Sequence, residues 1–206
     1  MRMYTTFLVV DDFLDNAAAL REHALKLEYP AQQGQFPGRN SLQRINIDGL
    51  AEAVSRIVGE PLVAAPPPQS HAKTRLALAA DEGRGKVHVD ESHWSGILYL
   101  SRNEDARGGT EFFRHKATGL DRFPFSNDQL QEAGFSSHAE AHRALIEEDG
   151  TNDRAWEQIM NVPMRFNRLL LLRPWLFHTA GPGFGDTPEN ARLVYLMFFN
   201  QPVRGN

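Results

Sequence analysis

Short apolar segments separated by turn-forming residues place the tightest limit on how this chain folds. From Thr74 onward they are TRLALAA, KVHVD, SGILYLS and GTEFF, and nearer the end they are RFNRLLLL, WLFHTA and ARLVYLMFFN. Glycine, aspartate, asparagine and serine bound these segments, which is typical of antiparallel β-structure. This part of the chain therefore predicts a β-sandwich or jelly roll.

Helical periodicity and loop-forming residues dominate the first third of the chain instead. Leu14–Lys26 and Ile47–Val58 have the spacing of amphipathic helices, and in the second Asp48 is the expected N-cap and Gly59 the expected end. A short strand is expected at Thr6–Val10 and an extended surface loop at Tyr29–Asn40. The proline-rich run Ala64–Pro68 is expected to stop regular structure and to form a boundary.

These patterns combine into one domain, because 206 residues suffice for one core and are few for two. We expect a mainly β fold with α-helices, in which residues 73–113 and 161–203 form the jelly-roll core and residues 1–68 support it from outside. Residues 114–160 are polar and helix-prone, and we interpret them as a helical insertion or lid. A connection of this length is usually functional.

The composition excludes several classes of function. The formal net charge is −4 with both signs mixed along the chain, so nucleic acid is not an expected partner. The absence of cysteine excludes disulfides, thiol catalysis, zinc ribbons and iron–sulfur clusters. The apolar run near the N-terminus has only four residues, too few for a signal sequence or a membrane span. We therefore expect a soluble cytoplasmic protein without a membrane partner.

His88 and Asp90 form an H-x-D pair within KVHVD, a segment with strand character. Residues two apart on a strand project to the same face, so an imidazole and a carboxylate would point into one cavity. Taken alone, H-x-D also fits a surface pair or a hydrogen-bonded pair. His178, on the later segment WLFHTA, supplies a second imidazole. Two histidines and one carboxylate are the ligands of the facial triad that holds non-haem iron(II) with open coordination positions.

Arg192 is the third candidate, in the most apolar segment of the chain, where it shares a face with Val194, Leu196 and Phe198. A guanidinium directed into a protein interior is costly unless it meets an anion. Its planar fork binds a carboxylate through two hydrogen bonds, which lysine cannot do. The alternative is an arginine at a strand end whose charged group reaches solvent.

The order HVD, GILYLS, GGTEFF, a helical stretch, LFHTA and ARLVYLMFF resembles the 2-oxoglutarate/iron(II) dioxygenases, in particular their prolyl-4-hydroxylase-like branch. The resemblance covers Lys73 to Asn200 and extends to a group of bacterial proteins in that superfamily. It implies a distorted double-stranded β-helix, the jelly-roll or cupin-like barrel, buttressed by the N-terminal helices. It also implies that His88, Asp90 and His178 are the iron ligands.

The same resemblance implies roles for residues around the ligands. Arg192 would bind the distal carboxylate of 2-oxoglutarate, and Tyr99 matches a tyrosine that hydrogen-bonds the same group. Gly108 and Gly109 match a Gly-Gly pair that turns the chain sharply into the next strand. One departure is the interval of fourteen positions from His178 to Arg192, which is long for the family and lies in the turn-rich GPGFGDTPEN.

The remaining polar and aromatic candidates are expected to be peripheral. Glu91 and His93 are interpreted as rim residues or as residues just behind the ligands, and His115 as a solvated loop residue that could instead line the mouth. His138 and His142 are one helical turn apart and could chelate a metal, but an exposed helix is the preferred interpretation. The aromatic residues near the motifs are expected to be core packing, and these are Trp175, Phe177, Phe198 and Phe199. The stretch 146–153 is expected to be a solvated turn.

The sequence thus predicts an iron(II)- and 2-oxoglutarate-dependent hydroxylase. It would release succinate and carbon dioxide while it hydroxylates an unactivated C–H bond of a second substrate, with molecular oxygen as oxidant. That substrate could be a small molecule, an amino acid or a peptide or protein side chain, and a homodimer is compatible with the sequence. Two alternatives remain at this point. One is a cupin-like metal enzyme that does not use 2-oxoglutarate, and the other is a silent metal-binding or interaction protein.

Overall fold

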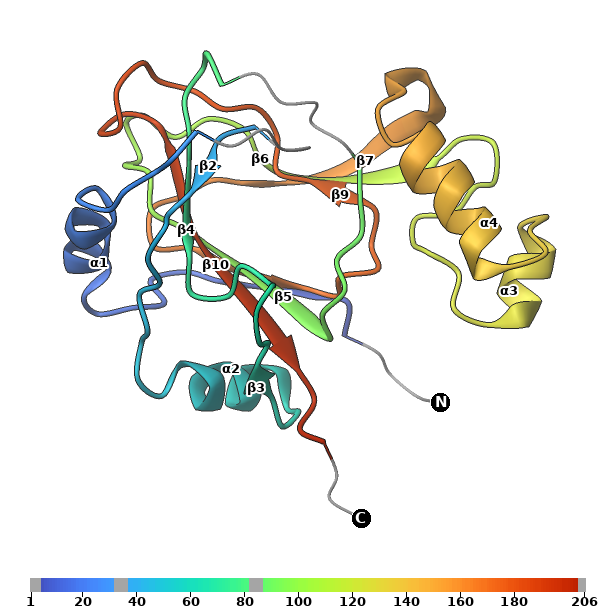
Figure 1. Ribbon diagram of the computed structural model, residues 1–206, viewed down its shortest axis with the longest axis horizontal. Coiled ribbons are helices and arrows are strands. Elements are labelled where there is room, and N and C mark those ends of the chain that lie inside the picture. The colour runs from blue at the N-terminus through green and yellow to red at the C-terminus, as the bar shows by residue number, and fades with distance from the viewer. Residues whose placement is uncertain (1–4, 32–36, 82–86, 204–206) are drawn as a thin grey trace.

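A computed structural model describes residues 5–31, 37–81 and 87–203 of the chain. Part of the predicted loop Tyr29–Asn40 and Lys86 of the KVHVD segment lie outside the described residues. The described part consists of two antiparallel β-sheets with helices on the outside (Figure 1). The mainly β fold with a few helices is as predicted, whereas the two sheets do not join into one closed barrel.

The larger sheet has seven strands in the order β1-β8-β5-β10-β4-β2, and β3 pairs with β10 beyond the end of β4. All these pairings are antiparallel, as the alternation of apolar segments and turns predicts. The strands are β1 Phe7–Val10, β2 Arg39–Asn40, β3 Val63–Ala64, β4 Thr74–Ala77, β5 Trp94–Tyr99, β8 Leu169–Leu172 and β10 Arg192–Asn200. The short strand β2 thus falls at the end of the predicted loop Tyr29–Asn40, and β3 overlaps the predicted boundary Ala64–Pro68 at Ala64.

The smaller sheet has the order β7-β6-β9, with β6 at Gly109–His115, β7 at Trp156–Pro163 and β9 at His178–Thr179. The sequence prediction assigns residues 156–160, the first five residues of β7, to the helical segment 114–160. The reason is the burial pattern of β7, in which only Trp156 and Val162 are buried, so polar residues interrupt the usual alternation. Gly109 fits where it is because its Cα lies against the main chain of Val162 on β7, too close for a side chain.

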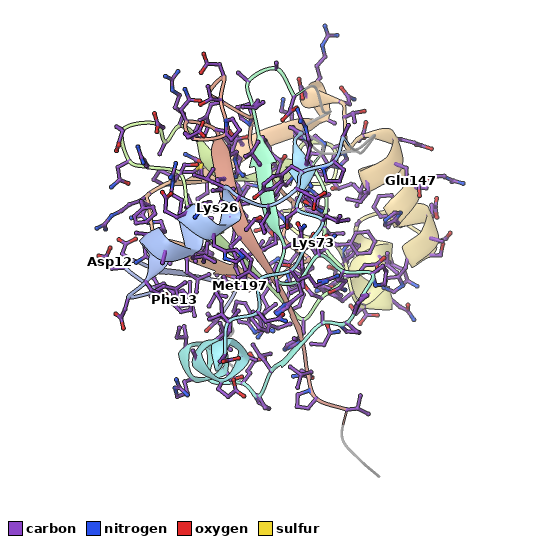
Figure 2. All side chains as sticks on the ribbon, turned by 60° about the vertical axis from the view of Figure 1, so that its left-hand side comes forward. Asp12, Phe13, Lys26, Lys73, Glu147 and Met197 are labelled. Carbon is purple, nitrogen blue, oxygen red and sulfur yellow. The ribbon has the colours of Figure 1, made fainter. Side chains whose placement is uncertain are left out.

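Strand β10 runs through the middle of the larger sheet, and its two faces differ. Leu193, Tyr195, Met197 and Phe199 point outward into an apolar core. Residues of α1 and α2 complete this core, and they are Leu20, Ala24, Leu50 and Val54. Helices α1 (Ala17–Ala24) and α2 (Leu50–Val58) therefore lie against the outer face of the sheet. Figure 2 labels Met197 beside these helices.

Both helices are shorter than their sequence pattern predicts. The N-cap of α2 is Gly49 with φ of 71°, so the prediction of Asp48 is wrong by one position. Glycine suits this position because the left-handed conformation is strained for residues with a side chain. Gly59 ends the helix as predicted, with φ of 71°.

A helical segment connects β6 to β7 and projects from one end of the molecule (Figure 1). It contains α3 (Asn127–Glu132), α4 (His138–His142), a π-helix at Arg143–Glu148 and a 3-10 turn at Asp153–Ala155. It has a core of its own, in which Leu130, Leu145 and Ile146 pack with Trp156 and Phe177. The prediction of a solvated turn at 146–153 is therefore wrong at Ile146, which is buried.

The two sheets pack face to face through residues of both. Phe112 of β6 and Val162 of β7 contact Leu170 and Leu172 of β8, and the Tyr99 hydroxyl on β5 lies 2.7 Å from the Thr110 hydroxyl on β6. These side chains therefore fill part of the space between the two sheets. Among the described helices, none has both the length and the apolar character needed to cross a bilayer.

Candidate metal centre and its cavity

His88 and His178 lie opposite each other at the edge of the smaller sheet. The His88 amide donates to the His178 carbonyl at 3.0 Å, and the His178 amide donates to the His88 carbonyl at 3.1 Å. This reciprocal pair is an isolated bridge, so the prediction that KVHVD forms a strand is wrong for its described residues. The pairing nevertheless sets the two imidazoles side by side, with ring centroids 4.3 Å apart.

Asp90 completes the group of three predicted from the sequence. Its carboxylate lies 3.6 Å from His88 Nε2 through one oxygen and 3.6 Å from His178 Nε2 through the other. One ligand atom from each residue lies within 4.8 Å of the other two, and no other such group of metal-ligating side chains occurs in the described ranges. The structure thus brings together residues that are 90 positions apart in the sequence.

Neighbouring groups orient these side chains. His178 Nδ1 lies 2.7 Å from the Leu176 carbonyl, so it is the protonated nitrogen and Nε2 has a lone pair to offer a metal. The Ser95 hydroxyl donates to Asp90 at 2.6 Å, and the Asp90 amide donates to the Pro174 carbonyl at 2.9 Å. Ligands held by such outer contacts are typical of metal sites in proteins.

The electrostatics of the group favour an ionised carboxylate. Burial alone would raise the pKa of Asp90, but the hydrogen bond and charge of His178, the charge of His88 and the Ser95 hydrogen bond together hold that pKa well below its usual value. Burial alone would lower the pKa of His178, and the hydrogen bond to Asp90 outweighs it and raises that pKa. A divalent cation would replace this proton-mediated attraction with direct bonds to the same three groups.

A cavity of about 210 Å³ opens beside the three residues and extends between the sheets. Its apolar wall comes from β5 and β10 and includes Ile97, Leu196 and Phe198. Phe198 was expected to be core packing, and this expectation is wrong because its side chain borders the cavity. Phe177 and Phe199 are fully buried core residues as predicted. We refer to this space as the inner cavity.

An outer groove of about 390 Å³ adjoins the inner cavity, and the two share Ser70, His88, Asp90 and Phe198 as lining residues. The helical segment between β6 and β7 supplies one wall of the groove through His142, Ile146 and Glu147. Figure 2 shows Glu147 on this helical segment at one edge of the molecule. Glu91 also lines the groove, which agrees with its expected place at the rim.

Arg192 lies at the start of β10, on the inner face of the sheet, and is only 3% exposed. Its Nη2 is buried without a hydrogen-bond partner among the described residues. Burial lowers the pKa of Arg192, and electrostatic interactions with Tyr99 and Glu111 partly oppose this shift. Arg192 and Tyr99 do not line the inner cavity themselves. Val194, which pairs with Tyr99, lies between Arg192 and the cavity residue Leu196 on the same face of β10.

Arg75 on β4 is a basic residue of the inner cavity that the sequence analysis misses. It lies opposite Val194, and its guanidinium donates to the Pro37 carbonyl at 2.9 Å and to Asn40 Oδ1 at 2.9 Å. Burial and the charge of Arg192 lower its pKa to about 10, so it stays protonated at neutral pH. One signal was available, because Arg75 interrupts an apolar strand in the same manner as Arg192.

Two further histidine predictions require correction. His115 is not a solvated loop residue but is 4% exposed at the end of β6, where it lies 3.1 Å from Asp149 and against the Trp156 ring. His93 is not a rim residue of the groove, since its Nε2 lies 2.6 Å from Glu60 and 2.8 Å from Arg173. His138 and His142 are exposed, as expected.

Comparison with solved structures places this arrangement of sheets among non-haem enzymes. The epimerase SnoN from nogalamycin biosynthesis, described as non-haem and α-ketoglutarate-dependent, superposes with a TM-score of 0.53 at 13% identity over 95% of this chain and 78% of SnoN. HygX from Streptomyces hygroscopicus, with nickel and 2-oxoglutarate bound, gives 0.52 at 13% identity over 97% of this chain and 84% of HygX. The carbocyclase SnoK from the nogalamycin pathway gives 0.50 at 10% identity, over 95% and 79% of the two chains.

The protein therefore has the fold of these α-ketoglutarate-dependent non-haem enzymes, and three side chains that could hold a metal ion are gathered in it. By sequence it belongs to DUF6445, a family of unknown function, which matches residues 2–199. No curated protein matches the chain closely enough to count as a relative.

Proposed function

We propose that this protein is an iron(II)- and 2-oxoglutarate-dependent oxygenase that hydroxylates a second substrate. The observation that carries the proposal is the pairing of His88, Asp90 and His178 around one point with a buried arginine, Arg192, further along the same interior. The triad alone fits several metal enzymes, whereas the arginine adds a requirement for an anion.

The residues present fit iron(II). Neutral imidazole nitrogens and one carboxylate oxygen are the donors of the 2-His-1-carboxylate triad, and no thiolate is available to favour softer ions. His88, Asp90 and His178 would hold the ion on one side, and the inner cavity lies on another. Iron(II) and 2-oxoglutarate, when bound, supply the oxidising chemistry that converts 2-oxoglutarate, oxygen and a C–H bond to succinate, carbon dioxide and an alcohol. HygX, with its nickel and 2-oxoglutarate, supports this choice of cofactors by analogy of fold.

Arg192 and Tyr99 would bind the distal carboxylate of 2-oxoglutarate. Arg192 has a buried nitrogen available for an acceptor, and its charge interacts with the Tyr99 side chain. The loop that precedes β10 returns Phe184 to the interior, where it packs with Tyr99 and Val194. The extra length between His178 and Arg192 therefore places an aromatic side chain beside the proposed carboxylate site.

The outer groove would admit the second substrate. It shares both His88 and Asp90 with the inner cavity, so a group entering from it reaches the metal centre. His142, Ile146 and Glu147 belong to the helical segment between β6 and β7, and we expect this segment to act as a lid that helps to select the substrate. Limited proteolysis with and without iron(II) and 2-oxoglutarate tests this role. Unchanged cleavage within residues 116–155 would favour a surface elaboration or an oligomer contact.

The decisive experiment measures 2-oxoglutarate binding to iron-loaded protein by calorimetry without oxygen. Arg192→Met should raise the dissociation constant tenfold or far more at nearly constant iron affinity, because removing one partner of a buried charged pair costs about 2–5 kcal/mol. Arg192→Lys should fall between, since lysine keeps the charge and loses the planar fork. Tyr99→Phe should cost on the order of 1 kcal/mol, for one hydrogen bond.

Two outcomes would contradict this assignment at different levels. If Arg192→Met binds 2-oxoglutarate as tightly as the parent protein, the carboxylate lies elsewhere. If the parent protein binds iron(II) but not 2-oxoglutarate, the cupin-like alternative without this cosubstrate is correct.

A further inference from the structure

Arg75 and Arg192 both lie on the inner face of the larger sheet, and only one of them is needed for 2-oxoglutarate. Arg75 and Arg192 lie on neighbouring strands of the larger sheet, where Arg75 pairs with Val194 and Arg192 pairs with Ala77. Their charges interact, since Arg192 lowers the pKa of Arg75. Like charges held together in an interior favour the binding of anions beside them.

The two arginines belong to different walls of the site. Arg192 lies near Tyr99 and Glu111, on the side of the smaller sheet. Arg75 belongs to a polar wall that comes from β2, β4 and the turn before β4. Arg75 Nη1 donates to Asn40 Oδ1 at 2.9 Å, and Asn40 Nδ2 donates to the Ser70 hydroxyl at 3.0 Å. Arg75, Asn40 and Ser70 all line the inner cavity.

This polar wall leads outward to the entrance. Ser70 lines the outer groove as well as the inner cavity, so the hydrogen-bonded series from Arg75 to Ser70 runs toward the side from which a second substrate arrives. The Asn40 amide and the Pro37 carbonyl hold the guanidinium in one orientation. A side chain fixed in this way loses little conformational entropy when it binds a ligand.

We propose that Arg75 binds a carboxylate of the second substrate, so that the substrate is a small carboxylic acid, such as an amino acid or an aliphatic acid. This inference rests on the proposed function, in which one carboxylate of 2-oxoglutarate belongs to the metal and the other to Arg192. The planar guanidinium can bind a carboxylate through two parallel hydrogen bonds. Ile97, Leu196 and Phe198 form the apolar remainder of the cavity wall and suit a short carbon chain. At about 210 Å³ the cavity is smaller than most pockets for drug-sized ligands.

The test uses full-length protein loaded with iron(II) and saturated with 2-oxoglutarate in the absence of oxygen. The probes are isovalerate, phenylacetate and N-acetyl-leucine, each with its neutral primary amide. Calorimetry should show that the parent protein binds at least one acid tenfold or more tightly than its amide. Arg75→Gln should abolish this preference, and Arg75→Lys should retain part of it. Arg39→Gln is the matched control, because Arg39 lies next to Asn40 on β2 but pairs with Asp81 outside the cavity, and its preference should equal that of the parent.

Visible absorption during the same titrations separates the failure of each idea. Chelation of iron(II) by 2-oxoglutarate should give a charge-transfer band, and its absence in the parent protein would overturn the proposed function itself. With the band present, the inference about Arg75 is wrong in any of three cases. In the first case, the parent protein binds the acids no more tightly than their amides. In the second, the preference for acids persists in Arg75→Gln. In the third, the acids weaken the absorption band because they displace 2-oxoglutarate. A loss of 2-oxoglutarate binding in Arg75→Gln would also overturn it, because Arg75 would then serve the cosubstrate.

Discussion

The two faces of strand β10 show how one strand serves both stability and chemistry. The outward residues from Leu193 to Phe199 are buried together under α1 and α2 and carry no charge. The inward residues begin with Arg192 and end with Leu196 and Phe198 at the inner cavity. A strand with period 2 can separate these tasks completely, since neighbouring residues never share a face. Substitutions on the outer face should therefore change stability, and substitutions on the inner side should change ligand binding.

The largest expected effect lies on the inner side, at the metal centre. His178→Ala should abolish iron(II) binding with little loss of folding, because a three-ligand site loses its chelation when one ligand is removed. Metal analysis of the purified variant, together with thermal unfolding, measures both quantities. His142→Ala is the control, since this histidine borders the outer groove but is exposed and is not one of the three grouped side chains. Full iron occupancy in His178→Ala would remove His178 from the site.

The next effect compares two leucines on opposite faces of β10. Leu193 is 1% exposed in the core beneath the helices, so Leu193→Ala should cost about 2–5 kcal/mol of unfolding free energy. Leu196 already borders a cavity, so Leu196→Ala should cost less, since fewer packing contacts are lost there. Urea denaturation of both variants measures the difference. Equal losses would show that the two faces are packed alike and that the comparison fails.

The smallest effect concerns an ion pair between Glu60, in the connection after α2, and Arg173, directly after β8. Glu60 follows α2 and forms an ion pair with Arg173, which is 3% exposed, while its other carboxylate oxygen lies 2.6 Å from His93. Glu60→Gln should cost about 1.5–3 kcal/mol at pH 7, the range for hydrogen bonds to charged groups. Denaturant unfolding measures it, and Glu157→Gln is the control, because the carboxylate of Glu157 is half exposed and pairs only with exposed Arg114 in the described part of the chain.

The pH dependence of this loss follows from the pKa of Glu60. Burial alone would raise that pKa, but hydrogen bonds from His93 and Arg173 outweigh burial and lower it below 4.5. A carboxylate with a lowered pKa in the folded state stabilises the protein above its unfolded-state pKa, and this contribution is lost as the pH falls through the folded-state value. The difference between Glu60→Gln and the parent should therefore be complete at pH 7 and shrink below about pH 4. A constant difference down to pH 3 would contradict the ion pair.

Local patterns in the sequence predict some parts of this structure and not others. The strands with strong apolar character, such as β5 and β10, are found where the sequence places them. Residues 156–160 of β7 are misassigned because the pairing of this strand depends on its neighbours in the fold more than on its own side chains. The side chains of His88 and Asp90 come together although KVHVD is not a strand. The single backbone bridge between His88 and His178 is enough to hold this segment against the smaller sheet.

The second arginine of the cavity shows a different limit. Arg192 was identified because its whole strand is apolar, so a charge there is conspicuous. Arg75 lies in a strand of only four residues, and what makes it part of the site is its pairing with Val194 across 119 positions of sequence. Such pairing depends on topology, which one sequence does not display. His115 was misplaced for the same reason, because the Trp156 ring that covers it arrives from a strand that was not foreseen.

The reciprocal backbone hydrogen bonds between His88 and His178 hold two of the three proposed metal ligands next to each other. Their amide protons should therefore exchange slowly with solvent even before any metal arrives, and loading should not require the chain to fold around the ion. If the site is formed before the metal binds, the bound ion depends on the type of donor atoms and on which metals are available, and not on folding coupled to binding. Nickel and copper bind such donors more tightly than iron(II) does. The metal bound to the isolated protein would then depend on the concentrations of the metal ions that the folded chain encounters.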